Sequence, residues 1–151
     1  MRAIDIEPEE VSALLEALDD EYKAWASYDQ VLRDFGPVRP FSNIIESEAR
    51  HITALARLFE RYGVPMPPNP WPGKVAQYAC LKEACEAGVS GEIENERLYR
   101  RLLVSARRPD IRAVFERLRE ASQLRHLPAF RRCAARYSGS RQEGAGHDLD
   151  Q

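Results

Sequence analysis

The sequence predicts an all-α protein, an antiparallel bundle of four helices, on three observations. Apolar residues recur at intervals of three and four along four long stretches, and no stretch alternates apolar and polar residues as a half-buried strand does. Proline and glycine separate the stretches, where helices end. The chain has 151 residues, the length of one domain with one core. We therefore expect a single bundle over residues 1–137.

The first helix is expected from about Pro8 to Phe35, because Gly36-Pro37 would stop it. The helical period places one apolar stripe along it. The members of that stripe are Leu14, Leu18, Trp25, Tyr28 and Leu32.

The second helix is expected to begin near Phe41, with Ser42 or Asn43 as its N-cap, and to end at Tyr62-Gly63. Residues 64–73 follow with five prolines, too many for a helix. We interpret this segment as a stiff crossover along one face or end of the bundle, between the second and third helices.

The third helix is expected over roughly Val75 to Ala106, where Gly88 and Gly91 would either kink it or divide it into two shorter helices. A fourth helix is expected after Pro109, with Asp110 as its cap. Pro128 should disturb its hydrogen-bond ladder, two residues after His126. The remaining residues, 138–151, are rich in glycine, serine and charge, which predicts a disordered tail.

The composition excludes several classes of partner and location. The 22 basic and 24 acidic residues nearly cancel, so we expect binding neither to nucleic acid nor to an anionic membrane. The N-terminus lacks the apolar core of a signal peptide, and no stretch reaches the roughly 18 consecutive apolar residues of a membrane span. We therefore expect a cytoplasmic protein.

Three cysteines, Cys80, Cys85 and Cys133, form an odd set without the spacing of a zinc finger. Disulfide frameworks belong mainly to small secreted domains. We therefore expect neither a disulfide nor a structural zinc site, and we interpret the cysteines as small core residues rather than redox groups.

Each helix carries a polar residue at a position where its apolar stripe favours leucine. A buried carboxylate without a partner costs several kcal/mol, so four such interruptions in one bundle indicate a shared site. The residues are Glu21 on the first helix, Glu48 and His51 on the second, Glu92 on the third and His126 on the fourth. Four aromatic residues are expected nearby, ordinarily as packing and hydrogen-bonding groups: Tyr22, Trp25, Tyr28 and Tyr99.

Two interpretations of this cluster remain open, and we favour a metal site. Glu48 and His51 are three residues apart, so a carboxylate oxygen and an imidazole nitrogen can reach one ion from the same side of a helix. Oxygen and nitrogen together suit iron, manganese or zinc. The alternative is a metal-free network in which His51 and His126 are protonated and pair with the glutamates.

From about Leu14 to Tyr137 the chain resembles a ferritin-like domain family related to rubrerythrins and of uncharacterised function. The matching stretches are Leu18–Ala24, Pro40–His51, Gly88–Glu92 with Leu98-Tyr99, and Ala121-Ser122 with His126–Phe130. The resemblance implies a carboxylate-bridged di-iron pattern, in which two helices each give a glutamate and two give a Glu-x-x-His pair. The residues that match are Glu21, Glu48 with His51, Glu92, and His126.

The fourth helix departs from that pattern. Its inward stripe runs through Leu118, Ser122 and His126, and Gln123, three residues before His126, stands where the second pair has glutamate. A neutral amide neither bridges two cations well nor balances their charge. Glu96, or Glu120 if Pro128 introduces a bulge, is a candidate to replace it.

Two functions follow from this. The resemblance implies an iron protein with peroxidase or ferroxidase activity and an external electron donor. The amide instead favours a non-enzymatic scaffold that binds a partner and keeps a degenerate metal site. Bundles of this type often pair through exposed helix faces, so a homodimer is expected on that general ground alone.

Overall fold

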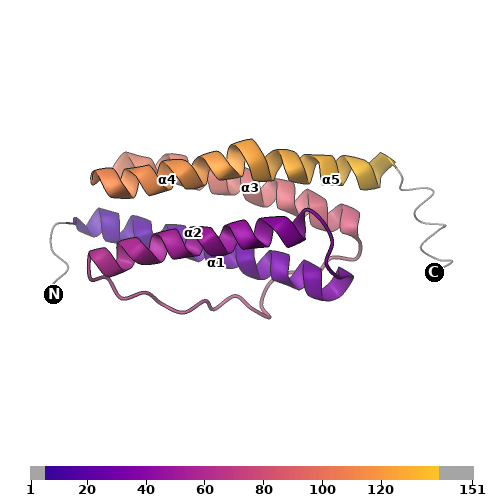
Figure 1. The fold of residues 1–151 in the computed structure, drawn as a ribbon, viewed down its shortest axis with the longest axis horizontal. Helices are drawn as coiled ribbons and strands as arrows, with labels where there is room; N and C mark the ends of the chain where they lie inside the picture. The colour runs from indigo at the N-terminus through magenta and orange to yellow at the C-terminus, as the bar shows by residue number, and fades with distance from the viewer. Residues whose placement is uncertain (1–5, 140–151) are drawn as a thin grey trace.

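The computed structural model describes residues 6–139, and all regular structure within them is helical (Figure 1). The first two helices are α1, Pro8–Phe35, and α2, Phe41–Arg61. The third is α3, Leu81–Ser105, and the fourth is a continuous run of α4, Pro109–Ala121, the π-helix η1, Ser122–His126, and α5, Leu127–Gly139. One layer contains α1 and α2, and the other contains α3 and the α4–η1–α5 run (Figure 1). The predicted helical bundle is confirmed.

The ends of the first two helices follow local chemistry. Pro8 begins α1, a position at which a backbone N–H would have no acceptor within the helix, so proline loses no hydrogen bond there. The N–H of Glu7 donates to Glu10 Oε1 at 3.3 Å. Gly36 ends α1 with φ 87°, a conformation that favours glycine. The prediction that Ser42 or Asn43 caps α2 is wrong, because the helix already begins at Phe41 and the N-cap position belongs to Pro40.

The proline-rich connection runs along the bundle from the end of α2 to the start of α3 (Figure 1). Three hydrogen bonds attach its proline-rich residues 64–73 to α1. Tyr22 donates to the carbonyl of Pro67 at 2.6 Å, Asn69 donates to the carbonyl of Tyr22 at 3.1 Å, and the Trp71 indole donates to Asp19 at 2.9 Å. The crossover therefore lies against α1, and its stiffness lets one short segment span the length of a helix.

The third helix begins at Leu81 rather than Val75, because residues 74–80 still belong to the connection. It is continuous, so the predicted break at Gly88 and Gly91 is wrong. Gly88 has a packing role instead, since a Cβ there would lie 2.6 Å from the ring of Phe130 on α5. A glycine inside a helix costs about 1 kcal/mol, which the close approach of α3 and α5 offsets.

The fourth helix contains the disturbance that Pro128 predicts. Pro128 has no N–H to donate to the carbonyl four residues earlier, and the ladder next to it changes from α to π, with the N–H of Leu127 donating to the carbonyl of Ser122. Asp110 is not the N-cap, since α4 already begins at Pro109. Its carboxylate instead accepts hydrogen bonds from Tyr62 at 2.8 Å and Arg61 at 2.7 Å.

The apolar core has two parts. The buried polar residues that the sequence predicts for the site lie between these two parts. One part includes Leu14, Leu55 and Phe115, and the other includes Phe41 and Phe130. None of the described helices is long and apolar enough to cross a membrane. Residues 140–151, which hold most of the predicted tail, lie outside the described part of the chain, and α5 continues through Gly139.

The cysteine prediction is wrong in two respects. Cys85 on α3 and Cys133 on α5 form a disulfide inside the second part of the core. Cys80 is exposed and has a free thiol. Spacing alone could not indicate the bond, because it joins residues 48 apart that become neighbours only when α3 packs on α5.

Candidate metal centre

The five residues that the sequence predicts for the site lie together in the middle of the bundle. All five are buried, with at most 8% of the surface of any of these residues exposed. They form two groups of three potential ligands, and within each group the ligand atoms lie within 4.8 Å of one another. The first group is Glu21, Glu48 and His51, and the second is Glu48, Glu92 and His126. Glu48 belongs to both.

Glu48 directs one oxygen toward each histidine. Its Oε1 lies 3.5 Å from Nδ1 of His51, one turn further along α2, and its Oε2 lies 3.5 Å from Nδ1 of His126. Glu21 Oε1 is 3.3 Å from Nδ1 of His51, and Glu92 Oε1 is 3.5 Å from Nδ1 of His126. The Nδ1 atoms of both rings therefore face the carboxylates, with Glu48 between them.

The opposite nitrogens of the two rings share one serine. Ser47 Oγ lies 3.3 Å from Nε2 of His51 and 3.0 Å from Nε2 of His126, and the rings are stacked with their centroids 5.5 Å apart. A hydroxyl oxygen can accept two N–H groups. If both rings carry a proton on Nε2, Ser47 accepts both, and each Nδ1 is left with a lone pair toward the carboxylates.

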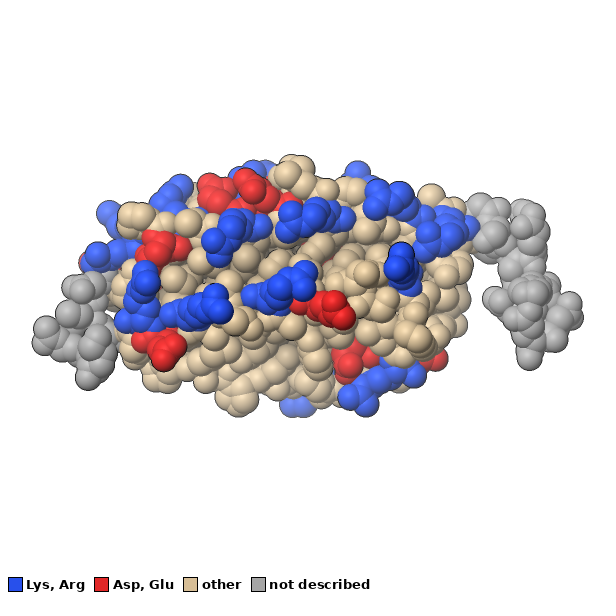
Figure 2. Space-filling view, viewed as in Figure 1, with Lys and Arg blue, Asp and Glu red and all other residues tan. Residues whose placement is uncertain are grey.

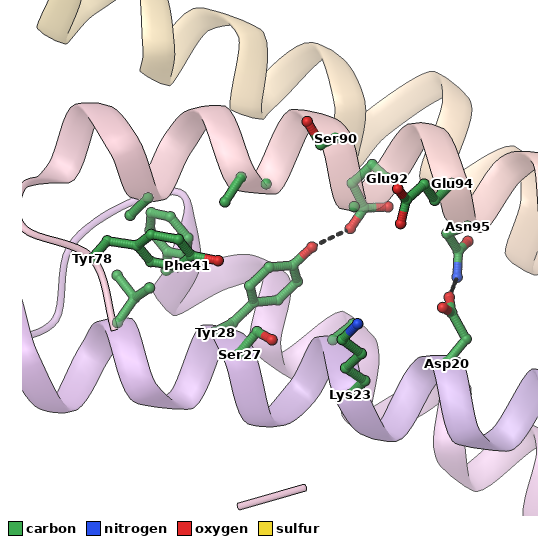
Figure 3. Close-up of a pocket in the computed structure, with 16 residues that line it drawn as sticks. Asp20, Lys23, Ser27, Tyr28, Phe41, Tyr78, Ser90, Glu92, Glu94 and Asn95 are labelled. Atoms are coloured by element: carbon green, nitrogen blue, oxygen red, sulfur yellow. Dashed lines mark hydrogen bonds between the residues drawn. The ribbon is translucent and has the colours of Figure 1, made fainter. Parts of the chain in front are cut away.

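Two tyrosines hold the outer oxygens of the other glutamates. Tyr28 on α1 donates to Glu92 Oε2 on α3 at 2.6 Å, which Figure 3 shows as a dashed line. Tyr99 on α3 donates to Glu21 Oε2 on α1, also at 2.6 Å. Each tyrosine follows the glutamate of its own helix by seven residues and binds that of the other helix. Each Oε1 is therefore oriented toward the histidines.

Within the described residues, the other two aromatic residues predicted near the site, Tyr22 and Trp25, form no hydrogen bond with its five members. Tyr22 bonds to the crossover, and Trp25 is only half-buried. Asn95 donates to Glu21 Oε2 at 3.4 Å and also to Asp20, a pair visible in Figure 3. Sequence reasoning missed Ser47 and Asp20. Ser47 carries a usable signal, because it lies one turn before His51 on the same helix face.

The residue opposite Glu92 is Ser122, not Gln123. The π-helix contains an extra residue per turn, so the inward position before His126 falls four residues earlier rather than three. Ser122 is buried and donates to Glu92 Oε1 at 2.7 Å, whereas Gln123 is exposed. The assignment of Gln123 to the site is therefore wrong.

Neither proposed replacement carboxylate reaches the cluster. Glu120 is exposed on α4. Glu96 is buried, but it accepts hydrogen bonds from Arg100 at 2.7 Å and Arg119 at 2.9 Å. The cluster therefore contains three carboxylates and two imidazoles, and a hydroxyl stands where the resemblance implies a fourth carboxylate.

The electrostatics favour positive charge between these carboxylates. Burial raises the pKa of Glu21 to about 7, with a further increase from the charge of Glu48. Burial alone would lower the pKa of His51, but Glu21 and Glu48 outweigh it and raise that pKa to about 10. For His126, burial is likewise outweighed by Glu48 and Glu92, and the pKa rises to about 9. In the metal-free protein, protons on the imidazoles balance the carboxylates.

Two buried atoms of the cluster form no hydrogen bond within the described part of the chain, Glu48 Oε1 and His126 Nδ1. Buried polar atoms without partners cost free energy and call for an explanation. Both face into the cluster, and each belongs to one of the two ligand groups. Carboxylate oxygen and imidazole nitrogen are the donors that iron, manganese and zinc accept, so the residues fit a metal site.

A pocket of about 380 Å³ between α1 and α3 reaches one edge of the cluster (Figure 3). Glu92 and Tyr28 form part of its wall, and Gly91 leaves its side open, since a Cβ there would meet nothing within 4 Å. Asp20 and Glu94 also line it, so a cation or a small molecule can approach Glu92 from this side.

Comparison with known proteins supports the fold and leaves the function open. Neither the family models nor the curated proteins give a match to this chain. A crystal structure of hypothetical protein MJ0754 from Methanococcus jannaschii DSM 2661 is similar, with a TM-score of 0.80 and 24% sequence identity over 89% of this chain and 84% of that one. At this identity the likeness establishes a shared helical fold.

Proposed function

We propose that the protein is a ferritin-like, antiparallel bundle that binds two metal ions, with Glu48 as the ligand common to both. The observation that carries the proposal is the pair of ligand groups joined at Glu48, each with two carboxylates and one imidazole. Glu21 and His51 would complete one position, and Glu92 and His126 the other. The partnerless atoms Glu48 Oε1 and His126 Nδ1 gain partners in this arrangement.

Iron is the metal we propose, with manganese and zinc as the alternatives that the same donors accept. Iron in this setting would supply one-electron chemistry, which suits a peroxidase or ferroxidase activity fed by an external electron donor. The chain's own residues orient the ligands. Tyr28 and Tyr99 hold one oxygen of Glu92 and Glu21, and Ser47 holds both rings by Nε2.

Metal analysis tests this proposal. Untagged protein is purified without chelator, and its metals are measured by mass spectrometry before and after anaerobic ferrous loading. We expect about two ions per chain, as in carboxylate-bridged bundles. The visible spectrum after exposure to air then reports whether loaded iron is oxidised. Less than one ion per chain after loading would contradict the proposal.

The second candidate function is a metal-free scaffold that binds a partner, and Ser122 is the observation in its favour. The hydroxyl adds no charge where the resemblance implies a carboxylate. Glu21 and His51 also lie 3.3 Å apart, within reach of a direct ion pair. The variant Glu48→Ala separates the two: it lowers metal content if the site binds metal, and it lowers only stability, by roughly 3 to 5 kcal/mol, if the cluster is a buried network.

A further inference from the structure

A second pocket, of about 410 Å³, opens between α2 and the α4–η1 segment, on the face that Figure 2 presents to the viewer. Its exposed lining includes three arginines, Arg50 from α2, Arg117 from α4 and Arg125 from η1. Its buried lining includes Ser47, His51 and His126. Figure 2 shows lysine and arginine side chains gathered along both helices on this face.

These three arginines are free to bind a ligand, whereas several other arginines of the chain are already paired. Within residues 6–139, Arg50, Arg117 and Arg125 form no salt bridge or hydrogen bond, while Arg61, Arg100, Arg101 and Arg119 each pair with a carboxylate. Like charges around one hollow repel one another, and that repulsion weakens when an anion lies between them. The pocket is therefore lined by three arginines that have no hydrogen-bond or salt-bridge partner among the described residues.

The arginines reach the pocket through the same local structure that forms the metal centre. Two of them immediately precede the histidines of the cluster, as Arg50-His51 and Arg125-His126. On α2 and η1 the imidazole is buried while the preceding guanidinium reaches the pocket rim. The sequence repeats this pair once on each side of the pocket, and the metal centre alone does not require it.

We propose that this pocket binds a small phosphate-type oxyanion, either free phosphate or a phosphate monoester. Guanidinium groups bind such oxyanions through paired, charge-assisted hydrogen bonds. A hollow with buried walls from two helices suits a compact anion rather than the backbone of a polyanion, which would follow the exposed face. This site adjoins the metal centre, because Ser47, His51 and His126 also line it, but the groups that would bind the anion are the three arginines, so the proposal does not rest on the proposed function.

Calorimetric titration with inorganic phosphate at low salt tests the proposal, on protein of measured metal content and again after removal of metal by chelator. We expect saturable binding in both forms. Arg117→Gln should weaken it about tenfold, since a hydrogen bond to a charged group contributes on that scale. Arg57→Gln is the matched control, because Arg57 is exposed on α2 and does not line the pocket; it should bind as the wild type does.

Two parallel titrations distinguish the sources of the anion, with glycerol phosphate as a monoester and with a short oligonucleotide. Tighter binding of either phosphate or the monoester, weakened by Arg117→Gln, supports the pocket and names its ligand class. The proposal is overturned if neither phosphate nor the monoester binds, if binding disappears with the metal, or if the oligonucleotide alone binds and Arg57→Gln weakens it as much as Arg117→Gln. Metal content is measured separately, so failure here leaves the metal proposal to its own test.

Discussion

The two halves of the cluster are built alike except at one position. In each half a glutamate from one helix is held by a tyrosine from another, and a histidine directs Nδ1 inward and Nε2 toward Ser47. On α2 the histidine is accompanied by Glu48, whereas on η1 it is accompanied by Ser122. The first half therefore contains two carboxylates, Glu21 and Glu48. The second half contains one, Glu92, and depends on Glu48 of α2 for its second carboxylate.

This difference makes the second half dependent on the first. The three carboxylates Glu21, Glu48 and Glu92 carry less negative charge than two divalent ions require for neutrality. The fourth carboxylate is missing because the residue that the π-helix directs inward beside His126 is Ser122 and not a glutamate, while Gln123 is exposed. The following substitutions and conditions test this difference between the two halves, from the largest expected effect to the smallest.

Replacing Glu48 by glutamine should remove both ions. The substitution keeps the shape of the side chain and eliminates the charge that both halves share. Metal content after ferrous loading, measured by mass spectrometry, should fall to near zero. Glu46→Gln on the exposed side of the same helix is the control and should retain wild-type content. Retention of one ion in Glu48→Gln would show that the halves are independent.

The paired variants His51→Ala and His126→Ala should each lose one ion and retain the other. Each histidine belongs to a single ligand group, while Glu48 remains available to the other group. Metal content should therefore fall by about half in either variant, and the double variant should bind no ion. If either single variant loses both ions, the two positions fill only together.

Metal-free protein should become less stable as the pH rises, and the metal should reverse that trend. The pKa values of His51 and His126 rise from 6.5 to about 10 and about 9 in the folded chain, so their contribution is complete below pH 6.5 and is lost as the pH passes those values. The pKa of Glu21 is raised from 4.5 to about 7, so this group also lowers the stability of the metal-free protein as the pH rises from 4.5 to about 7. Metal displaces the imidazole protons, so it binds more tightly as the pH rises.

The measurement is the difference in melting temperature between metal-loaded and metal-free protein at several values of pH. We expect this difference to grow from pH 6 to pH 9. A difference that stays constant over that range would contradict proton displacement.

Removing the tyrosine hydroxyls should weaken each half separately. Tyr99→Phe frees Glu21 Oε2, which still has Asn95 as a donor, whereas Tyr28→Phe leaves Glu92 Oε2 without its tyrosine donor. A hydrogen bond to a charged group contributes about 1.5 to 3 kcal/mol, and the loss should be larger for Tyr28→Phe. Metal titration of both variants checks the order, and equal affinities would contradict it.

Ser122→Ala should have a small effect and Gln123→Ala none. The serine hydroxyl donates a hydrogen bond to Glu92, worth about 1.5 kcal/mol in metal-free protein, the lower end for a hydrogen bond to a charged group, while Gln123 is exposed. Chemical denaturation of both variants measures the difference. Destabilisation by Gln123→Ala that exceeds that of Ser122→Ala would place the amide, and not the hydroxyl, beside the cluster.

The sequence by itself determined the helical fold, the crossover and the members of the cluster. Helical periodicity is a property of neighbouring residues, so the stripes that include Glu21, Glu48, His51 and Glu92 can be read from local spacing. His126 could be found in the same way, and Pro128 showed where its helix would be irregular. Local chemistry therefore located all five residues before any packing was known.

Only the tertiary structure decided how these residues meet. The helical stripe already included Ser122, but the sequence cannot show how a disturbed hydrogen-bond ladder continues, so the regular Glu-x-x-His spacing assigned the place of the second glutamate to Gln123, whereas the π-helix gives that place to Ser122. The disulfide between Cys85 and Cys133 depends on the packing of α3 against α5, as does the contact of Gly88 with Phe130. The shared position of Glu48, with one oxygen toward each histidine, exists only because η1 places the ring of His126 against the ring of His51 on α2.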